Sequence, residues 1–367
     1  MQRTAVANPV DWYRLSRGVC MPIAIGADDP VYAPFNIQCH EFKRSIAGLR
    51  PGCTLGPRGQ VNMVTSYVDA SFVYGSTRTT SSSLRARRGG LLDTWNYFRR
   101  QNLKPLLPPQ LDNPNEECVG RRAGFYCFRS GDARTNQQVH LVVLHTIHTR
   151  QHNRLATQLA LINPHWTGAR LFEEARHIHI ALVQHILVNE YLPILLGKSE
   201  CKKYSLVESA APDIESAHWD YYDPNLNAGI WHSFAAAAFR FGHSTVPSDV
   251  HRINVLRHPV RVYALRQLFR QPWPLFEPGA VDEFLLGMTE TASQNVDPFV
   301  SGELSGHLFQ EPNEFIGMDL IAMNIQRGKR LESSLHLLIR YFLYLPALIA
   351  HHNTIHSHYA DTNPFVL

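Results

Sequence analysis

The chain has 367 residues, and 44% of them are hydrophobic, so it can bury a sizeable core in one large domain or two ordinary ones. Its 35 Lys and Arg against 31 Asp and Glu give a formal net charge of +4 without a dense basic stripe, which gives no case for nucleic acid as a partner. None of the six cysteines forms a CxxC pair, which argues against a zinc ribbon.

The first 60 residues are rich in Pro and Gly and are predicted to be loops. Their opening, MQRTAVANPVDWYRL, has no hydrophobic signal core, and the chain has no N-x-Ser/Thr sequon, so both features argue against simple secretion. Further along, Cys118 and Cys127 flank a short loop that a disulfide could close. Such a disulfide would fit an oxidising compartment.

A polar run, TSYVDASFVYGS, follows the loops. If it is extended, the side chains of Thr65, Tyr67, Asp69 and Ser71 point to one side and the backbone carbonyls stay available. Hydroxyl, carbonyl and carboxylate oxygens are the ligands that calcium prefers. A surface strand with its polar residues facing outward gives the same pattern, so the residues alone leave both interpretations open.

Hydrophobic periodicity predicts a mainly α-helical chain with long loops. The predicted helices cover about 138–161, 169–195, 258–270, 280–290 and 314–327. Asn163 and Pro164 should end the first of them.

Histidines recur on the two long predicted helices. His145, His148 and His152 are spaced to share one helix face, where they could bind zinc if a fourth ligand or water completed the shell. The HExxH pattern is missing, so hydrogen-bonded packing is favoured over zinc. The same interpretation applies to three histidines of the next helix: His177, His179 and His185.

The stretch WHSFAAAAFRFGHSTVP, Trp231–Pro247, is predicted to be a helix that Thr245 and Pro247 break. Arg240 and His243 stand three residues apart and should project from nearly the same face. An imidazole can ligate haem iron, and a guanidinium can bond a haem propionate. The alternative is a core histidine that bonds a free carbonyl near a helix C-terminus.

After Lys329 the chain carries an apolar run, Leu335–Ala350, that Arg340 and Pro346 interrupt. It is too short and too interrupted for a membrane span, so a buried or interfacial helix is predicted.

These pieces form an ordered set that resembles the animal haem peroxidases of the peroxidase–cyclooxygenase superfamily, above all the peroxinectin-, peroxidasin- and chorion-peroxidase-like members. The motifs that carry the resemblance are TSYVDASFVYGS, SGDARTNQQ, LHTIHTRQHNRLATQLALINPHW, LFEEARHIHIALVQHILVNEYLPILLG, AFRFGHSTVP and GMDLIAMNIQRG. The resemblance implies a mostly helical domain with haem among its central helices. We expect a partial domain over residues 1–328, incomplete at its N-terminus, and a divergent tail over 329–367.

The resemblance also implies roles for individual residues. His243 matches the proximal histidine that binds haem iron, and Asn324 matches the asparagine that accepts its hydrogen bond. Arg240 matches an arginine near a haem propionate, and Arg134 matches the arginine that polarises peroxide. The implied calcium ligands are Thr65, Tyr67, Asp69 and Ser71.

Three departures from the family pattern are visible. The upstream segment with the distal His-Asp pair has no counterpart, so the general base is expected to be missing and peroxide turnover impaired. Gln137 replaces the glutamate that forms a haem ester, so non-covalent haem b is expected. After Gly328 the chain reads KRLESSLHLL in place of an Arg-Asp-His-Gly segment.

The expected function is a haem peroxidase that uses hydrogen peroxide to oxidise phenolic or halide donors, with calcium as a second cofactor. The alternatives are a non-catalytic adhesion or binding protein with an extracellular-matrix or cell-surface partner, and a truncated fragment. An RGD tripeptide, which would favour adhesion, is absent from the sequence. The resemblance implies an extracellular location, and the oligomeric state is left open.

Overall fold

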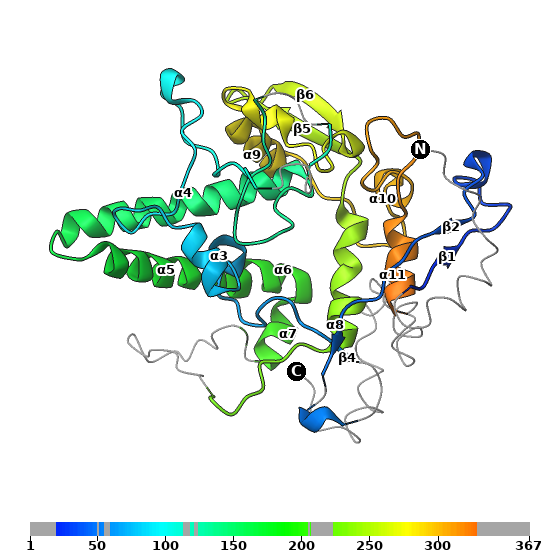
Figure 1. Cartoon of the computed structure of the whole chain (residues 1–367), viewed down its shortest axis with the longest axis horizontal. Coiled ribbons are helices and arrows are strands. Elements are labelled where there is room, and N and C mark those ends of the chain that lie inside the picture. Colours follow the sequence, from blue (N-terminus) through cyan, green and yellow to red (C-terminus); the bar gives the residue numbers. More distant parts are fainter. Residues whose placement is uncertain are drawn as a thin grey trace.

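The computed structural model describes residues 20–49, 51–54, 59–112, 118–120, 124–204, 206 and 223–328. Within them, helices and long connecting segments predominate, as the sequence predicts, and strands are short (Figure 1). The predicted tail and its apolar run, Leu335–Ala350, lie outside the described residues.

Two long helices, α4 (Val139–Ile162) and α5 (Gly168–His185), lie side by side (Figure 1). The side chain of Gln138 caps α4 by accepting the His140 N–H, and the side chain of Thr167 caps α5 in the same way. A π-helical turn, Ile186–Tyr191, carries α5 into α6, Leu192–Leu196. Both long helices are therefore confirmed close to their predicted ranges.

The remaining elements are short. The helices are α2 (Ser71–Tyr74), α3 (Arg78–Ser83), α7 (Lys198–Lys203), α8 (His232–Ala236), α9 (Ala280–Glu290), α10 (Gly302–Ser305) and α11 (Leu320–Gly328). The 3₁₀ segments are Ala33–Phe35, Pro51–Cys53, Arg99–Gln101, Ala238–Thr245, Leu265–Gln267 and Trp273–Phe276. The antiparallel pairs are β1 (Ile23–Ala24) with β2 (Cys39–His40), β3 (Ala47–Gly48) with β4 (Gly59–Gln60), and β5 (Asp249–Ile253) with β6 (Pro259–Ala264).

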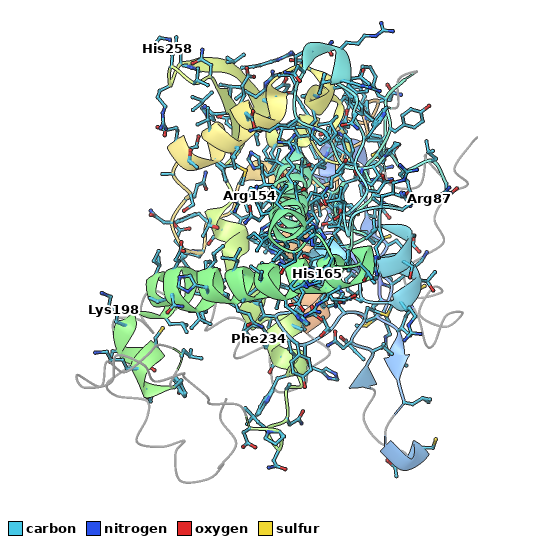
Figure 2. All side chains as sticks on the ribbon, turned by 90° about the vertical axis from the view of Figure 1, so that its left-hand side faces the viewer. Arg87, Arg154, His165, Lys198, Phe234 and His258 are labelled. Atoms are coloured by element: carbon cyan, nitrogen blue, oxygen red, sulfur yellow. A yellow bond between two sulfur atoms is a disulfide. The ribbon has the colours of Figure 1, made fainter. Side chains whose placement is uncertain are left out.

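The predicted helix over 258–270 is wrong, because these residues form β6 and a 3₁₀ turn. The Asn254 side chain accepts the backbone N–H groups of Leu256 and His258, and Arg257 has a φ of 62°, so the connection closes as a tight turn. His258, at this end of the hairpin, is labelled in Figure 2. The prediction over 280–290 is confirmed by α9, whereas the helix predicted from 314 begins at Leu320.

The main core packs one face of α4 against α9 and the segments around residues 250–285. Its fully buried side chains include Val139, Val143, Leu268, Leu275 and Phe284. A second, smaller cluster lies around α2 and α5. It consists of Ala70, Val73, Tyr74, Leu84, Leu92 and Phe172.

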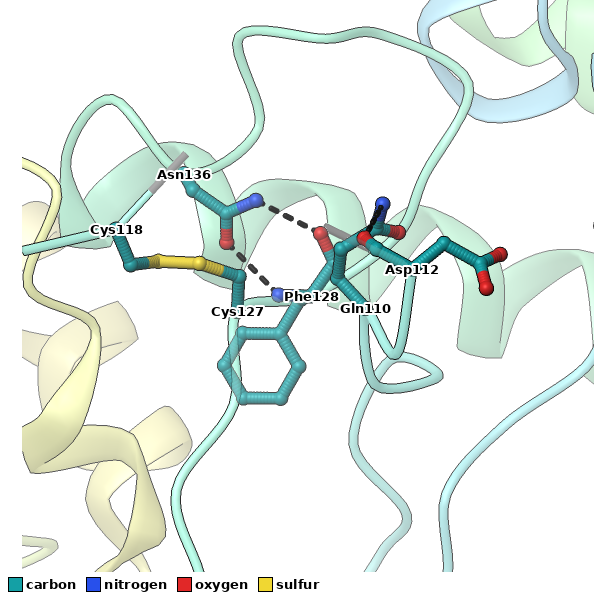
Figure 3. Close-up of a disulfide and its surroundings, with 6 residues drawn as sticks. All are labelled: Gln110, Asp112, Cys118, Cys127, Phe128 and Asn136. Atoms are coloured by element: carbon teal, nitrogen blue, oxygen red, sulfur yellow. Dashed lines mark hydrogen bonds between the residues drawn. A yellow bond between two sulfur atoms is a disulfide. The ribbon is translucent and has the colours of Figure 1, made fainter. Parts of the chain in front are cut away.

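Cys118 and Cys127 form a disulfide, as the sequence allowed (Figure 3). Beside it, the Asn136 amide accepts the Phe128 N–H at 2.9 Å and donates to the Phe128 carbonyl at 2.7 Å. These bonds tie the disulfide loop to the segment that leads into α4. The other four cysteines, Cys20, Cys39, Cys53 and Cys201, are free.

Helices α5 and α6 together form one stretch, Gly168–Leu196, that is long and apolar enough to cross a membrane by length and composition alone. Its mean hydropathy is 1.3, and only 6% of its most apolar window is buried. Ile178, Leu182 and Ile186 recur at helical spacing along its exposed side.

We expect Gly287→Ala to destabilise the protein by about 1–3 kcal/mol. A Cβ at Gly287 would lie 1.9 Å from the His251 carbonyl oxygen, so α9 would have to move away from β5. This clash outweighs the better helix propensity of alanine, about 1 kcal/mol. Urea unfolding measures the difference. Gly302→Ala is the control because a Cβ there meets nothing within 4 Å, and equal stability of the two variants would contradict the prediction.

Candidate functional site

The site begins where α8 ends. Ala237 has φ −133° and ψ −68°, which interrupts the predicted single helix, and residues 238–245 continue as a 3₁₀ segment. A 3₁₀ helix has three residues per turn, so Arg240 and His243 lie one above the other. The segment ends at Thr245, as predicted. Helix α11 lies beside α8 and brings further side chains to this point (Figure 1).

Asn324 of α11 joins the two predicted residues. Arg240 Nη1 donates to Asn324 Oδ1 at 3.1 Å, and Asn324 Nδ2 lies 2.7 Å from His243 Nδ1. An arginine can only donate, so it must face the amide oxygen, and the amide nitrogen is left to donate to the imidazole. The structure thus brings all three residues together, but with the opposite hydrogen-bond direction from the one that the resemblance implies.

His243 has the properties of a metal-ligating imidazole. Burial, and next to it the charge of Arg240, lower its pKa to about 4, so the ring is neutral at pH 7. Neutral imidazole is the form that binds metals. Its Nε2 has no hydrogen-bond partner among the described residues, but it carries the ring proton while Nδ1 accepts from Asn324, so ligation through Nε2 requires the proton to be on Nδ1.

Arg240, which is next to His243, has two further arginines near it. Burial, and after it the charges of Arg327 and Arg134, lower the pKa of Arg240 to about 10. Arg327 is partly buried, its Nε has no hydrogen-bond partner, and its Nη1 donates to Ser45 Oγ at 3.4 Å. Neither Arg240 nor Arg327 pairs with a carboxylate of the described residues. Two partly buried cations without a counter-charge favour an anionic ligand.

Sequence reasoning missed Arg327. It follows Asn324 by three residues, which places both side chains on neighbouring positions of one face of α11. That spacing was the available signal. The donor set of a neutral imidazole and two arginines without counter-charges fits a haem group, which combines a ligand-accepting iron with two carboxylates.

Arg134 lies near this cluster but is already paired. Its Nε and Nη2 donate to the two carboxylate oxygens of Asp132 at 2.9 and 2.8 Å, and its side chain is 65% exposed. These bonds are the main reason why the pKa of Asp132 is lowered. The side chain of Gln137 makes no hydrogen bond with the described residues, and its carbonyl accepts the Arg270 N–H at 3.1 Å. Its predicted role therefore stays a prediction.

The predicted calcium ligands do not form the extended run that alternation suggested. Ser71 begins α2, and the residues before it are not in a strand. Thr65 Oγ1 accepts the Tyr67 N–H at 3.1 Å, and Asp69 Oδ1 accepts the Ser71 N–H at 3.0 Å, so both side chains stabilise local turns. The described residues contain no group of three or more His, Cys, Asp or Glu side chains suited to a metal.

Gly131 lets the turn that carries Arg134 lie close to the backbone of residues 71–75. A Cβ at Gly131 would lie 2.3 Å from the Ser71 carbonyl oxygen and 2.5 Å from the Gly75 nitrogen. Only glycine permits this approach of backbone to backbone. The loop that carries Asp132 and Arg134 therefore lies directly on α2.

Three histidines of α4 and α5, His148, His152 and His179, belong to a hydrogen-bonded chain, as the packing interpretation predicts. His152 Nε2 donates to the Gly90 carbonyl at 3.0 Å, so its Nδ1 must accept the Tyr74 hydroxyl at 2.9 Å. The Tyr74 oxygen then accepts from His179 Nδ1 at 2.8 Å, and His148 Nδ1 donates to His179 Nε2 at 2.9 Å. The Gly90 carbonyl thereby determines which ring nitrogen carries the proton in the neutral imidazoles of His152, His179 and His148.

The other histidines of these helices lie outside that chain. His145 Nδ1 bonds the Leu141 carbonyl at 2.6 Å, while its buried Nε2 has no partner in the part of the chain that the structure describes. His177 and His185 are exposed. We therefore find no zinc-like arrangement of these imidazoles among the described residues.

The fold agrees with the comparison to known families. The family model of the animal haem peroxidases matches residues 9–348. The chain therefore belongs to the animal haem peroxidase family. The match extends past Gly328, and the division into a domain over 1–328 and a tail over 329–367 stays a prediction.

Curated relatives are similar over most of this chain. A chorion peroxidase of Drosophila melanogaster is 38% identical over 320 residues, which cover 86% of this chain and 37% of the relative. A peroxidasin of the same organism is 35% identical over 324 residues, which cover 84% of this chain and 20% of the relative. The chain thus spans well under half the length of these relatives.

Solved structures share the fold. Peroxidase A from Dictyostelium discoideum superimposes with a TM-score of 0.67 at 24% identity, over 85% of this chain and 59% of that one. A fatty acid α-dioxygenase of Oryza sativa gives a TM-score of 0.62 at 15% identity, over 85% of this chain and 52% of that one. At these identities the likeness establishes the fold alone.

We expect the free energy of unfolding to fall as the pH drops from about 6.5 to about 4. Burial lowers the pKa of His152 and His179 to about 4, so between these values the unfolded chain binds protons that the folded chain does not. Each such group contributes a slope of up to about 1.4 kcal/mol per pH unit. Urea unfolding across this range measures the slope.

His179→Gln should make that slope shallower by removing one buried imidazole. His165→Gln, which removes an exposed imidazole, is the matched control and should leave the slope nearly unchanged. Parallel pH profiles for the wild type and His179→Gln would show that the buried histidines do not cause the loss of stability at low pH.

Proposed function

We propose that this chain binds haem b at His243 and supports peroxidase chemistry, with hydrogen peroxide as oxidant and a small phenolic or halide donor as reductant. The observation that carries the proposal is the joining of Arg240, Asn324 and His243 beside Arg327 in a chain of this family. Bound haem would supply the redox centre at which peroxide is reduced and the donor is oxidised.

The residues of the site divide the binding of haem between them. His243 offers a neutral imidazole to the iron, and Arg240 and Arg327 offer guanidinium groups to the propionates. Gln137 has no carboxylate with which to form an ester, so the bound group should be non-covalent and extractable by acid and organic solvent.

Asn324 couples these two contacts. Its single amide oxygen now accepts from Arg240, which leaves Nδ2 facing His243 Nδ1. If a propionate accepted the hydrogen bonds of Arg240, the oxygen would be free to turn to His243 and accept a hydrogen bond from Nδ1–H. That orientation places the imidazole lone pair on Nε2, where iron can take it.

Arg134 is our candidate for the group that donates hydrogen bonds to peroxide and stabilises negative charge on the departing oxygen. Asp132 fixes the position of its guanidinium through two hydrogen bonds. For the second cofactor, calcium, we propose the oxygens of four residues next to the same turn. They are Thr65, Tyr67, Asp69 and Ser71.

We also propose an extracellular location, with a matrix or cell-surface partner open to test. The Cys118–Cys127 disulfide supports an oxidising compartment. The similarity to a chorion peroxidase and to peroxidasins supports it as well.

The test of the haem site is a haem titration of the purified full chain, followed in the Soret region. The wild type should take up about one haem per chain, and His243→Ala should lose the Soret band because the iron loses its ligand. His165→Ala, an exposed imidazole, should bind as the wild type does. An unchanged band in His243→Ala would overturn the assignment, and later mixing with peroxide and a phenol measures turnover.

The test of the calcium site compares Asp69→Ala with the wild type in calcium and in chelator. In chelator we expect a loss of about 1 kcal/mol, because Asp69 Oδ1 accepts the Ser71 N–H in a local turn. In calcium at 100 times its dissociation constant, the loss should grow by about 2.7 kcal/mol. Thermal unfolding measures both, with Asp112→Ala as a control at an exposed aspartate. Equal losses in the two buffers would mean that Asp69 only stabilises the local turn.

A further inference from the structure

The hydroxyl of Tyr74 lies in an unusual position for a buried phenol. The residue is 1% exposed, in the cluster between α2 and α5. Its oxygen lies 2.9 Å from His152 Nδ1 and 2.8 Å from His179 Nδ1. Both bonds are of ordinary strength and length, so the hydroxyl is held between two imidazole rings.

The direction of these bonds is determined. The Gly90 carbonyl can only accept, so the proton of His152 is on Nε2 and its Nδ1 carries a lone pair. The Tyr74 proton must therefore point at that lone pair, and His179 must donate to the Tyr74 oxygen. The phenol faces a base on one side and a hydrogen-bond donor on the other.

The other buried tyrosines among the described residues have no such base. The Tyr32 hydroxyl faces the carbonyls of Ser305 and Gly317 at 3.5 and 3.3 Å, and a carbonyl does not take up a proton near neutral pH. The Tyr263 hydroxyl accepts from Arg252 at 3.4 Å, and a guanidinium has no lone pair to offer. Of these three phenols, only Tyr74 can transfer its proton within the protein.

We propose that Tyr74 is a one-electron redox site of this protein. In the step, the Tyr74 O–H bond breaks, the electron leaves to a one-electron oxidant, and the proton moves to His152 Nδ1. The products are a neutral tyrosyl radical and an imidazolium. A single electron from a donor, with return of the proton from His152, restores the starting state.

The surroundings favour this step over loss of the proton alone. Burial raises the pKa of Tyr74, so a phenolate does not form at neutral pH. The radical is neutral, and the charge of the products lies on the His152 imidazolium, which burial disfavours and its two hydrogen bonds stabilise. After the transfer, the imidazolium still donates to Gly90 and to the Tyr74 oxygen, and His179 still donates to that oxygen. Nearby Arg85 and Arg176 oppose the new positive charge, but both lie within 4.0 Å of a Glu173 carboxylate oxygen.

The proposal rests on the proposed function only for its natural oxidant, which would be the oxidised haem centre. The test therefore uses the haem-free full chain and a photogenerated ruthenium(III) tris-bipyridine complex as oxidant. Electron paramagnetic resonance of samples frozen after illumination records the radical. Failure of haem binding would leave this experiment unaffected, so the two proposals fail separately.

We expect a persistent tyrosyl signal in the wild type, because a radical at 1% exposure is shielded from the coupling that removes radicals at the surface. Tyr74→Phe should lose this signal. Tyr263→Phe, the matched control at a buried phenol without a base, should keep it. A signal that survives in Tyr74→Phe would overturn the proposal, and so would the absence of a persistent signal in the wild type.

A second variant separates the role of the base from that of packing. His152→Gln keeps a polar side chain at this position but has no nitrogen that can take the proton. Radical formation should slow by roughly 10²-fold, the size of a lost proton-transfer partner. An unchanged rate would overturn the assigned proton acceptor, and this variant tests the proposal even where Tyr74→Phe does not fold.

Discussion

Helix α4 has to satisfy two different neighbours at once, and the rest of the structure follows from that constraint. Its apolar positions, Val139, Val142 and Val143, are fully buried in the main core. It also buries polar side chains, among them Thr146 beside these valines and His152 on another face. A buried polar group is costly unless it is hydrogen-bonded, so this face can pack only where partners are supplied.

Those partners come from three different parts of the chain. Gly90 and Tyr74 satisfy His152, while Thr146 bonds back to a carbonyl of its own helix. His179 reaches from α5 to the same hydroxyl. The hydrogen bonds thus fix α2 and α5 on α4, and α2 in turn carries the close contact at Gly131 that positions the Arg134 turn. The packing of α2 and α5 on α4 therefore also positions the Arg134 turn, which forms one side of the candidate site.

Local sequence signals predicted the two long helices, but they did not predict contacts between residues far apart in the chain. The caps at Gln138 and Thr167 and the stop at Asn163 act within one turn, so local sequence determines where α4 and α5 begin and where α4 ends. The helix predicted over 169–195 changes to a π-helical turn after His185. The hairpin was missed because its Val and Tyr positions satisfy a helical period as well as an alternating one, and the Asn254 turn decides between them. The hydrogen bonds to Tyr74 span 78 and 105 residues, and no local pattern encodes them.

In the candidate site, too, residues close in sequence could be predicted together, whereas residues far apart in sequence could not. The spacing of Arg240 and His243 places both side chains together whether the segment is α-helical or 3₁₀, so that prediction was robust. Asn324 and Arg327 follow Arg240 and His243 by more than 80 positions, so no local pattern places them at the site. Only the family resemblance pointed to Asn324.

The single amide oxygen of Asn324 determines which hydrogen bonds the site can form at one time. It can serve Arg240 or His243 Nδ1–H but not both through the same lone-pair direction, and in this structure Arg240 holds it. An anion that bound Arg240 would therefore allow the ring proton of His243 to move to Nδ1, and ligation at His243 would draw the Asn324 oxygen away from Arg240. Two contacts that share one acceptor are thermodynamically linked, and the linkage is reciprocal. A haem group presents its carboxylates and its iron in one rigid molecule, so it can meet both conditions in one binding event, whereas a free anion or a free metal ion meets only one.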